Sequence, residues 1–223
     1  VAPGAAFEVR EPWTRLGEAF EHFKDHCQRR VDDPNARFSA ARLRNLKDLL
    51  KPILRSVQRE CQQYDDEARW LIALISDTGM RLSEAAGLIK DDLYLDHEYP
   101  HIVLKVHPWR RLKTKGSERI VPLAGEALWA TRQAQSATQS QFLFPRYCNE
   151  KGCKSNSASA ALNKWLSSRV PYGCVVHSFR HSIRDRLRVV ECPHDIMDRL
   201  GGWSVSGIGE SYGTGYPIDV LFK

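Results

Sequence analysis

The chain has 223 residues, 42% of them hydrophobic and 27% charged, a composition typical of a globular protein. This length allows one well-packed core, or one domain with an ordered arm. No apolar run approaches the ~20 residues that a membrane span needs, so we expect no membrane partner. Lys and Arg number 33 against 27 Asp and Glu, giving a net charge of +6. This excess fits a polyanionic partner, and it fits an ordinary solvated basic surface equally well.

The cysteines indicate a reducing environment. A domain of this size does not need disulfides to be stable, so we expect reduced thiols in a cytosol-like compartment. Cys148 and Cys153 have a spacing that zinc ligands can show, but no second Cys or His pair follows at the distance found in zinc fingers. The sequence therefore argues against a metal site. The six cysteines are Cys27, Cys61, Cys148, Cys153, Cys174 and Cys192.

The first 64 residues are charged and helical in pattern. Apolar side chains recur at helical spacing within residues 7–63, and Pro52 predicts a kink or a boundary there. We assign residues 1–64 to a leading helical segment that is part of, or packed on, the domain formed by residues 65–223. The chain starts at Val1 rather than at a methionine, which indicates a fragment or a processed chain.

The middle of the chain changes from helical to β-rich. Residues 67–76 form a strongly apolar helical pattern that stops before Gly79. Residues 101–106 and 119–121 are rich in β-forming side chains, and residues 115–117 are the expected turn between them. We therefore predict a small antiparallel sheet, either a hairpin or three strands, within a helical chain.

The last third of the chain is again helical in pattern. Helices are expected around residues 125–135, 158–169 and 177–190, and Pro193 stands where the first turn of another would begin. The fold class is therefore mainly α with a small antiparallel β-sheet (α+β). The apolar face of the helix over residues 177–190 is expected to bury Phe179, Ile183, Leu187 and Val190.

Two pairs of polar residues suggest an anion site. His177 and Arg180 are three residues apart at a helix start, so their side chains share a face near the helix N-terminus. Arginine offers a planar fork for phosphate oxygens, and histidine exchanges protons near neutral pH. Arg81 follows Gly79 closely and can pair with Glu84. The plainer alternatives are a capping histidine, a surface arginine and an ordinary ion pair within a helix.

Three further residue types complete a possible phosphodiester site. Lys113 and Lys115 lie close to the expected hairpin turn, although hairpin tips are commonly just charged. Tyr212 follows Trp203 by nine residues, and Tyr216 is the alternative phenol. A phenol is only about 0.1% ionised at pH 7, so it would need nearby positive charge to act as a nucleophile.

Taken in order along the chain, these residues resemble the catalytic domain of the tyrosine recombinases, the phage integrase family. The first arginine motif of that family is similar to residues 78–84, and its lysine hairpin to residues 112–123. Residues 177–181, His-Ser-Phe-Arg-His, match the His-x-x-Arg box. Trp203 takes the place of a histidine that is more usual in integrases. The resemblance covers roughly residues 65–216 and implies the fold of that catalytic domain.

The resemblance also implies roles for the site residues. Two arginines and the tryptophan would hold the scissile phosphate, the phenol would attack it, a lysine would protonate the leaving oxygen, the histidine would assist proton transfer and a glutamate would orient an arginine. The catalytic residues would be Arg81, Lys113, His177, Arg180, Trp203 and Tyr212, with Glu84 as the orienting residue, Lys115 as the alternative lysine and Tyr216 as the alternative nucleophile.

The implied function is site-specific DNA recombination through a 3′-phosphotyrosyl intermediate, with no metal and no cofactor. The implied partner is double-stranded DNA, on which a homotetramer would assemble at paired sites from a protein that is monomeric in free solution. The expected location is cytoplasmic and nucleoid-associated, of prokaryotic type. The alternatives are DNA relaxation of the type IB topoisomerase kind and a catalytically silent DNA-binding remnant. The apolar tail, residues 217–223, would dock either on a neighbouring protomer or on its own domain.

Overall fold

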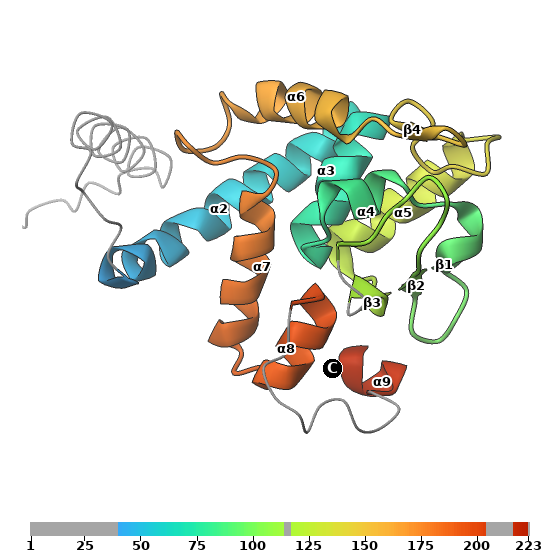
Figure 1. Cartoon of the computed structure of the whole chain (residues 1–223). Coiled ribbons are helices and arrows are strands. Elements are labelled where there is room, and N and C mark those ends of the chain that lie inside the picture. Colours follow the sequence, from blue (N-terminus) through green and yellow to red (C-terminus); the bar gives the residue numbers. More distant parts are fainter. Residues whose placement is uncertain (1–39, 114–116, 204–215, 223) are drawn as a thin grey trace, which may run out of the picture.

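The structure, a computed structural model, describes residues 40–113, 117–203 and 216–222, with side chains from residue 51 onward (Figure 1). Within these residues the chain is mostly helical and carries two small antiparallel sheets, so the predicted fold class is confirmed. The helices are α2 (Ala40–Tyr64), α3 (Glu67–Thr78), α4 (Leu82–Ala86), α5 (Gly125–Ala137), α6 (Ser155–Leu166), α7 (Ser178–Val189), α8 (His194–Gly201) and α9 (Ile218–Phe222), with a 3-10 turn η1 (Lys90–Asp92). The strands are β1 (Leu93–Tyr94), β2 (His101–Leu104), β3 (Arg119–Pro122), β4 (Cys148–Asn149) and β5 (Gly152–Cys153).

Helix α3 forms the centre of the core, and α2, α4, α5, α6 and α7 pack on it (Figure 1). Its first turn is capped by the Asp66 carboxylate, which accepts a hydrogen bond from the Arg69 N–H at 3.0 Å. Its end is capped by Gly79, whose φ of 63° lies in the left-handed region that favours glycine. Because neighbours cover it on several sides, eight of its twelve residues are buried and none is exposed. The predicted apolar helix and its stop before Gly79 are confirmed.

Helix α2 runs unbroken through Pro52, so the boundary that this proline suggested is not present. Beyond the proline, Leu54, Val57 and Cys61 are buried in the same core as α3. Burial raises the pKa of the Cys61 thiol to about 12, which keeps it neutral and unreactive. The division of the chain at residue 64 stays a prediction.

The larger sheet has the order β1-β2-β3 and is antiparallel throughout, which confirms the predicted three-stranded alternative. Ile102 pairs with Val121, and Leu104 pairs with Arg119. Residues 105–118 connect β2 to β3 and include a tight turn in which His107 bridges to Arg110. The connection is therefore longer than the predicted hairpin turn at residues 115–117. Its residues 114–116 lie outside the described part of the chain.

Helix α7 differs from its predicted packing at one end. Phe179 is buried, whereas Ile183 and Leu187 are only half-buried and Val190 is 71% exposed. Val190 was expected in the core, but α7 ends at Val189 and the chain reverses at Glu191, whose φ is 57°. The reversal leaves Val190 beyond the helix face that packs on the domain.

The cysteine prediction is wrong at one pair. Cys148 and Cys153 face each other across β4 and β5, with Cα atoms 4.2 Å apart, and form a disulfide. The expectation of reduced thiols came from domain size, whereas this bond follows from the local register of a short hairpin. Cys61 and Cys192 are free thiols, and Cys27 lies outside the described residues.

The C-terminal tail packs on its own domain. Helix α9 lies against β3, where Leu221 is buried, and the Phe222 ring lies 5.5 Å from the Tyr99 ring. Of the two placements that the sequence left open, the structure therefore shows the one within the same chain. Among the described residues, no helix has the length and apolar character required to cross a membrane.

Gly79 provides a test of this packing. A Cβ at Gly79 would overlap the Ile183 side chain, whereas Gly173, at φ 82°, has open space around it. We expect Gly173→Ala to lower the free energy of unfolding by about 1–2 kcal/mol, from left-handed strain alone. Gly79→Ala should cost about 1–3 kcal/mol more, because the overlap adds to the strain. Urea denaturation measures both, and equal losses would show that α7 does not press on Gly79.

Candidate active site

Arg81 and Glu84 form the first part of the site, at the start of α4. The left-handed turn at Gly79 ends α3 and directs the chain into α4. The Glu84 carboxylate accepts hydrogen bonds from the Arg81 main-chain N–H at 3.0 Å and from the Arg81 Nη1 at 2.5 Å. The Glu84 side chain is 1% exposed and the Arg81 side chain is 22% exposed. A buried carboxylate therefore holds Arg81, while the Arg81 side chain stays partly exposed.

Arg119 also belongs to the site, although it is not among the residues predicted from the motifs. It is 3% exposed, and its Nη2 donates to Glu84 Oε2 at 2.9 Å. Its other donors reach the carbonyl oxygens of Ser117, at 2.8 Å, and Leu200, at 3.0 Å. A signal was present in the sequence, since Arg119 and Val121 are two residues apart on a strand and must share its buried face.

Arg180 lies beside Arg81, although the two are far apart in the chain. It is 4% exposed, and its Nη1 donates to the Gly79 carbonyl at 2.7 Å. The Nη2 atoms of Arg81 and Arg180 both point to the Gly202 carbonyl oxygen, at 3.3 Å and 3.5 Å. The two guanidinium groups therefore converge on one oxygen position.

Trp203 is the next residue after Gly202, whose carbonyl the two arginines share. Gly202 caps α8 in the left-handed region, with φ 59°, and turns the chain so that Trp203 lies against α7. The guanidinium carbons of Arg180 and Arg184 each lie 4.7 Å from a Trp203 ring centroid, a distance typical of cation–π contacts. Arg184 also pairs with Asp198 at 3.0 Å. Arg184 was not predicted, although its i+4 spacing from Arg180 places it on the same face of α7.

His177 stands at the N-terminus of α7, with its ring 5.3 Å from the His181 ring. Burial lowers the pKa of His177, and the positive charges of His181, Arg180, Arg81 and Lys113 lower it further. The neutral imidazole is therefore favoured near pH 7.

The electrostatics of the site favour an anion. Burial and the neighbouring Arg81 lower the pKa of Arg180 to about 10. Burial alone would raise the pKa of Glu84, but attraction and hydrogen bonds from Arg119 and Arg81 bring it below its ordinary value. The arginines thus outnumber the carboxylates, and an added anion would relieve their mutual repulsion.

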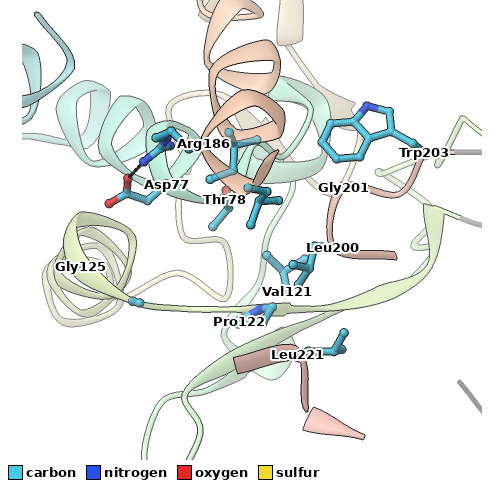
Figure 2. Close-up of a pocket in the computed structure, with 13 residues that line it drawn as sticks. Asp77, Thr78, Val121, Pro122, Gly125, Arg186, Leu200, Gly201, Trp203 and Leu221 are labelled. Atoms are coloured by element: carbon cyan, nitrogen blue, oxygen red, sulfur yellow. Dashed lines mark hydrogen bonds and ion pairs between the residues drawn. The ribbon is translucent and has the colours of Figure 1, made fainter. Parts of the chain in front are cut away.

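A cavity of about 320 Å³ lies behind the tryptophan (Figure 2). Its walls come from β3, α7, α8 and α9, and they are mostly apolar. At one end Arg186 pairs with Asp77 at 2.9 Å. The described residues contain no group of three or more His, Cys, Asp or Glu side chains that could hold a metal ion. Neither Arg81 nor Arg180 lines this cavity.

Comparison with known proteins decides the family. The sequence profile of the phage integrase family matches residues 45–214, which is most of the chain. The chain belongs to the phage integrase family. No curated protein matches it by sequence.

Solved structures resemble this family member at low identity. The XerA recombinase is 14% identical with a TM-score of 0.51, over 77% of this chain and 57% of that one. The Tn1549 transposon integrase is 16% identical with a TM-score of 0.49, over 80% of this chain and 64% of that one. The XerH site-specific recombinase is 19% identical with a TM-score of 0.49, over 72% of this chain and 46% of that one. The chain thus spans less than two thirds of the length of each.

For this member of the phage integrase family, the remaining predicted residues are placed as follows. Lys113 is exposed in the connection between β2 and β3, while Lys115 and Tyr212 lie outside the described residues. Tyr216 is 36% exposed and its hydroxyl donates to the Asp195 carboxylate in the first turn of α8. That end of α8 is about 10 Å from Gly202 along the helix. Tyr216 is therefore engaged away from the arginine pair.

Glu84 provides a stability test of the site. We expect Glu84→Gln to lower the free energy of unfolding by about 3–5 kcal/mol, because the buried Arg119 would keep its charge without a carboxylate partner. Chemical denaturation measures this loss. The control is Arg188→Gln, which breaks the exposed pair with Asp185 and should change stability by about 0.5 kcal/mol or less. A loss as small as that of the control would contradict the buried ion pair.

His177 provides a test of the charge at the site. In the free protein its imidazole should titrate below the ordinary value of 6.5, since burial and positive neighbours favour the neutral form. Inorganic phosphate bound between the arginines would add negative charge and raise that midpoint. NMR titration of the His177 ring, with and without phosphate, measures both effects. In His181→Asn the free-protein midpoint should also rise; a midpoint above 6.5 in the unmodified protein would refute this charge distribution.

Proposed function

We propose that the protein is a site-specific DNA recombinase that cuts and rejoins DNA through a 3′-phosphotyrosyl intermediate. The observation that carries the proposal is the convergence of Arg81 and Arg180 on the Gly202 carbonyl oxygen. Two guanidinium groups that can share one acceptor can also hold the non-bridging oxygens of one phosphate. Membership of the phage integrase family supports the same reading.

The phosphate would be bound by the two arginines together with Trp203. Its indole N–H is a hydrogen-bond donor, and the ring is held next to Arg180 by the cation–π contact. These donors stabilise the negative charge that builds up on phosphorus oxygens in a five-coordinate transition state. Glu84 keeps Arg81 in place through its two hydrogen bonds.

The covalent step would use Tyr212. Its phenolic oxygen attacks phosphorus, a P–O bond to tyrosine forms, and the bond to the 5′-oxygen breaks. The leaving 5′-oxygen takes a proton from Lys113, or from Lys115 if that lysine is the acid. His177 assists the transfer of the phenolic proton, which its favoured neutral form allows. The reverse reaction, with a 5′-hydroxyl of the other strand, rejoins DNA.

The phosphotyrosine conserves the energy of the cleaved bond, so this reaction needs no nucleotide cofactor, and the arginines supply the charge that a metal ion would otherwise provide. We further propose that double-stranded DNA is the partner and that four protomers assemble on two paired sites. Residues 65–223 would form the catalytic domain, preceded by the helical segment 1–64. The protein would act at the nucleoid of a prokaryotic-type cell.

The nucleophile is tested with a nicked DNA substrate that traps covalent intermediates. We expect the unmodified protein and Tyr216→Phe to form a protein–DNA adduct and Tyr212→Phe to form none, because only Tyr212 carries the attacking phenol. Denaturing gel electrophoresis measures the adduct. Arg81→Lys should reduce its rate about 10²–10³-fold, as expected for loss of one stabilising donor.

Two outcomes would contradict the assignment. An adduct that persists in Tyr212→Phe but disappears in Tyr216→Phe would transfer the role to Tyr216. A chelator should leave the rate unchanged, and a chelator-sensitive cleavage would indicate a metal nuclease instead. Relaxation of supercoiled DNA without recombinant products would indicate a topoisomerase.

A further inference from the structure

Arg119 joins three separate segments of the site through one buried side chain. It lies at the start of β3 and bonds to Glu84 in α4 and to the Leu200 carbonyl in the last turn of α8. Its third contact, to the Ser117 carbonyl, fixes the end of the segment that carries the candidate lysines. We propose that Arg119 is a positioning residue, which sets the placement of Arg81 through Glu84 and the placement of Trp203 through the C-terminal turn of α8. Its consequence for catalysis rests on the proposed function.

The link to Arg81 runs through the Glu84 carboxylate. Oε2 of Glu84 accepts from Arg119 Nη2 at 2.9 Å and from the Arg81 main-chain N–H at 3.0 Å. Oε1 accepts from Arg81 Nη1 at 2.5 Å. Because the carboxylate is a rigid plane, a shift of the Oε2 partner rotates the group and moves Oε1 with it. The position of Arg119 is thereby transmitted to the Arg81 guanidinium.

The link to Trp203 runs through the main chain at the end of α8. Arg119 Nε donates to the Leu200 carbonyl at 3.0 Å. A Cβ on Gly202 would lie 2.7 Å from Arg119 Nη1, so this turn rests directly on the guanidinium. The carbonyl of Gly202 accepts from Arg81 and Arg180, and Trp203 follows Gly202 in the chain. A displaced Arg119 would therefore shift both the tryptophan and the oxygen that marks the phosphate position.

An arginine suits this role because three of its nitrogens donate in fixed directions. A lysine would keep the charge opposite Glu84 but offers one flexible ammonium instead of a planar fork. The charged groups around Glu84 are Arg81 next to its own helix, Arg119 on β3 and Arg180 on α7. Arg199, on α8, adds positive charge near Arg119. Removing Arg119 alone would therefore disturb both the geometry and the charge balance, and the two effects have to be separated.

The test compares two variants. Arg119→Lys keeps the charge and removes the directed donors. The double variant Arg119→Gln with Glu84→Gln removes both charges of the buried pair, and the only charge that then loses its carboxylate is the partly exposed Arg81. The first measurement is the indole N–H signal of Trp203 in a ¹⁵N-correlated NMR spectrum, assigned with Trp203→Phe. The second is the rate of covalent adduct formation on the nicked DNA substrate, compared with the dissociation constant for the same DNA.

We expect both variants to shift the Trp203 signal and to slow adduct formation about 10²-fold, as expected when reacting groups are misplaced by about 1 Å. The dissociation constant should change by less than about 3-fold, because affinity for DNA is shared among many phosphate contacts and the variants keep Arg81 and Arg180. The matched control is Arg69→Lys. Arg69 lies over Trp165, at 5.0 Å, so this variant should shift the Trp165 signal and leave Trp203 and the adduct rate unchanged.

Some outcomes would overturn the inference. If the Trp203 signal stays in place in Arg119→Lys and in the double variant, Arg119 does not position it. If adduct formation also stays within about 2-fold of the unmodified rate, Arg119 contributes only to stability. If Arg119→Lys does not fold, the double variant decides by the Trp203 signal alone, because its loss of Glu84 also releases Arg81 and affects the adduct rate. If the unmodified protein forms no adduct, the proposed function fails, while the Trp203 signal still decides whether Arg119 positions the turn.

Discussion

The buried ion pair between Glu84 and Arg119 is the contact on which the arrangement of the site depends. Charges in a protein interior are tolerated only when nearly every polar atom around them has a partner. Here the remaining partners are the main chain of α4, the segment before β3 and the end of α8. Satisfying one buried charge therefore fixes the mutual placement of three segments that are far apart in the sequence. The placement of Arg81 and Trp203 depends on this buried pair.

Much of the fold could be predicted because its signals are local. Helix α3 has an apolar pattern, a capping Asp66 and a left-handed Gly79, and each of these acts within a few residues. Strands β4 and β5 contain two residues each, too few for any alternating pattern, so neither the strands nor the disulfide between them could be foreseen. Val190 was misplaced for a related reason: periodicity indicates a helix face, but not where the helix stops.

The site, like the fold, could be predicted from the sequence only in part. Motif order identified Arg81, His177, Arg180 and Trp203 because their residue types and sequence of appearance are distinctive. The contacts that bring the arginines together end on main-chain oxygens, of Gly79 and Gly202 for Arg180 and of Gly202 for Arg81. A carbonyl oxygen is present at every position of a sequence, so no motif reveals these partners. Strand alternation places Arg119 on the buried face of β3. The sequence does not show that a carboxylate covers this face, so Arg119 could not be told from an ordinary basic surface residue.

The shared bond to the Gly202 carbonyl has a consequence for the speed of ligand entry. Two guanidinium groups that face the same point repel each other. Glu84 holds Arg81 and the Gly79 carbonyl holds Arg180, and the shared acceptor offsets part of the remaining repulsion. The peptide dipole keeps them together at low energetic cost, because an uncharged oxygen binds each group more weakly than an anion does. When an anionic oxygen binds there, the two guanidinium groups exchange the carbonyl for a stronger acceptor. Because both groups already face this point, binding requires little rearrangement of their side chains.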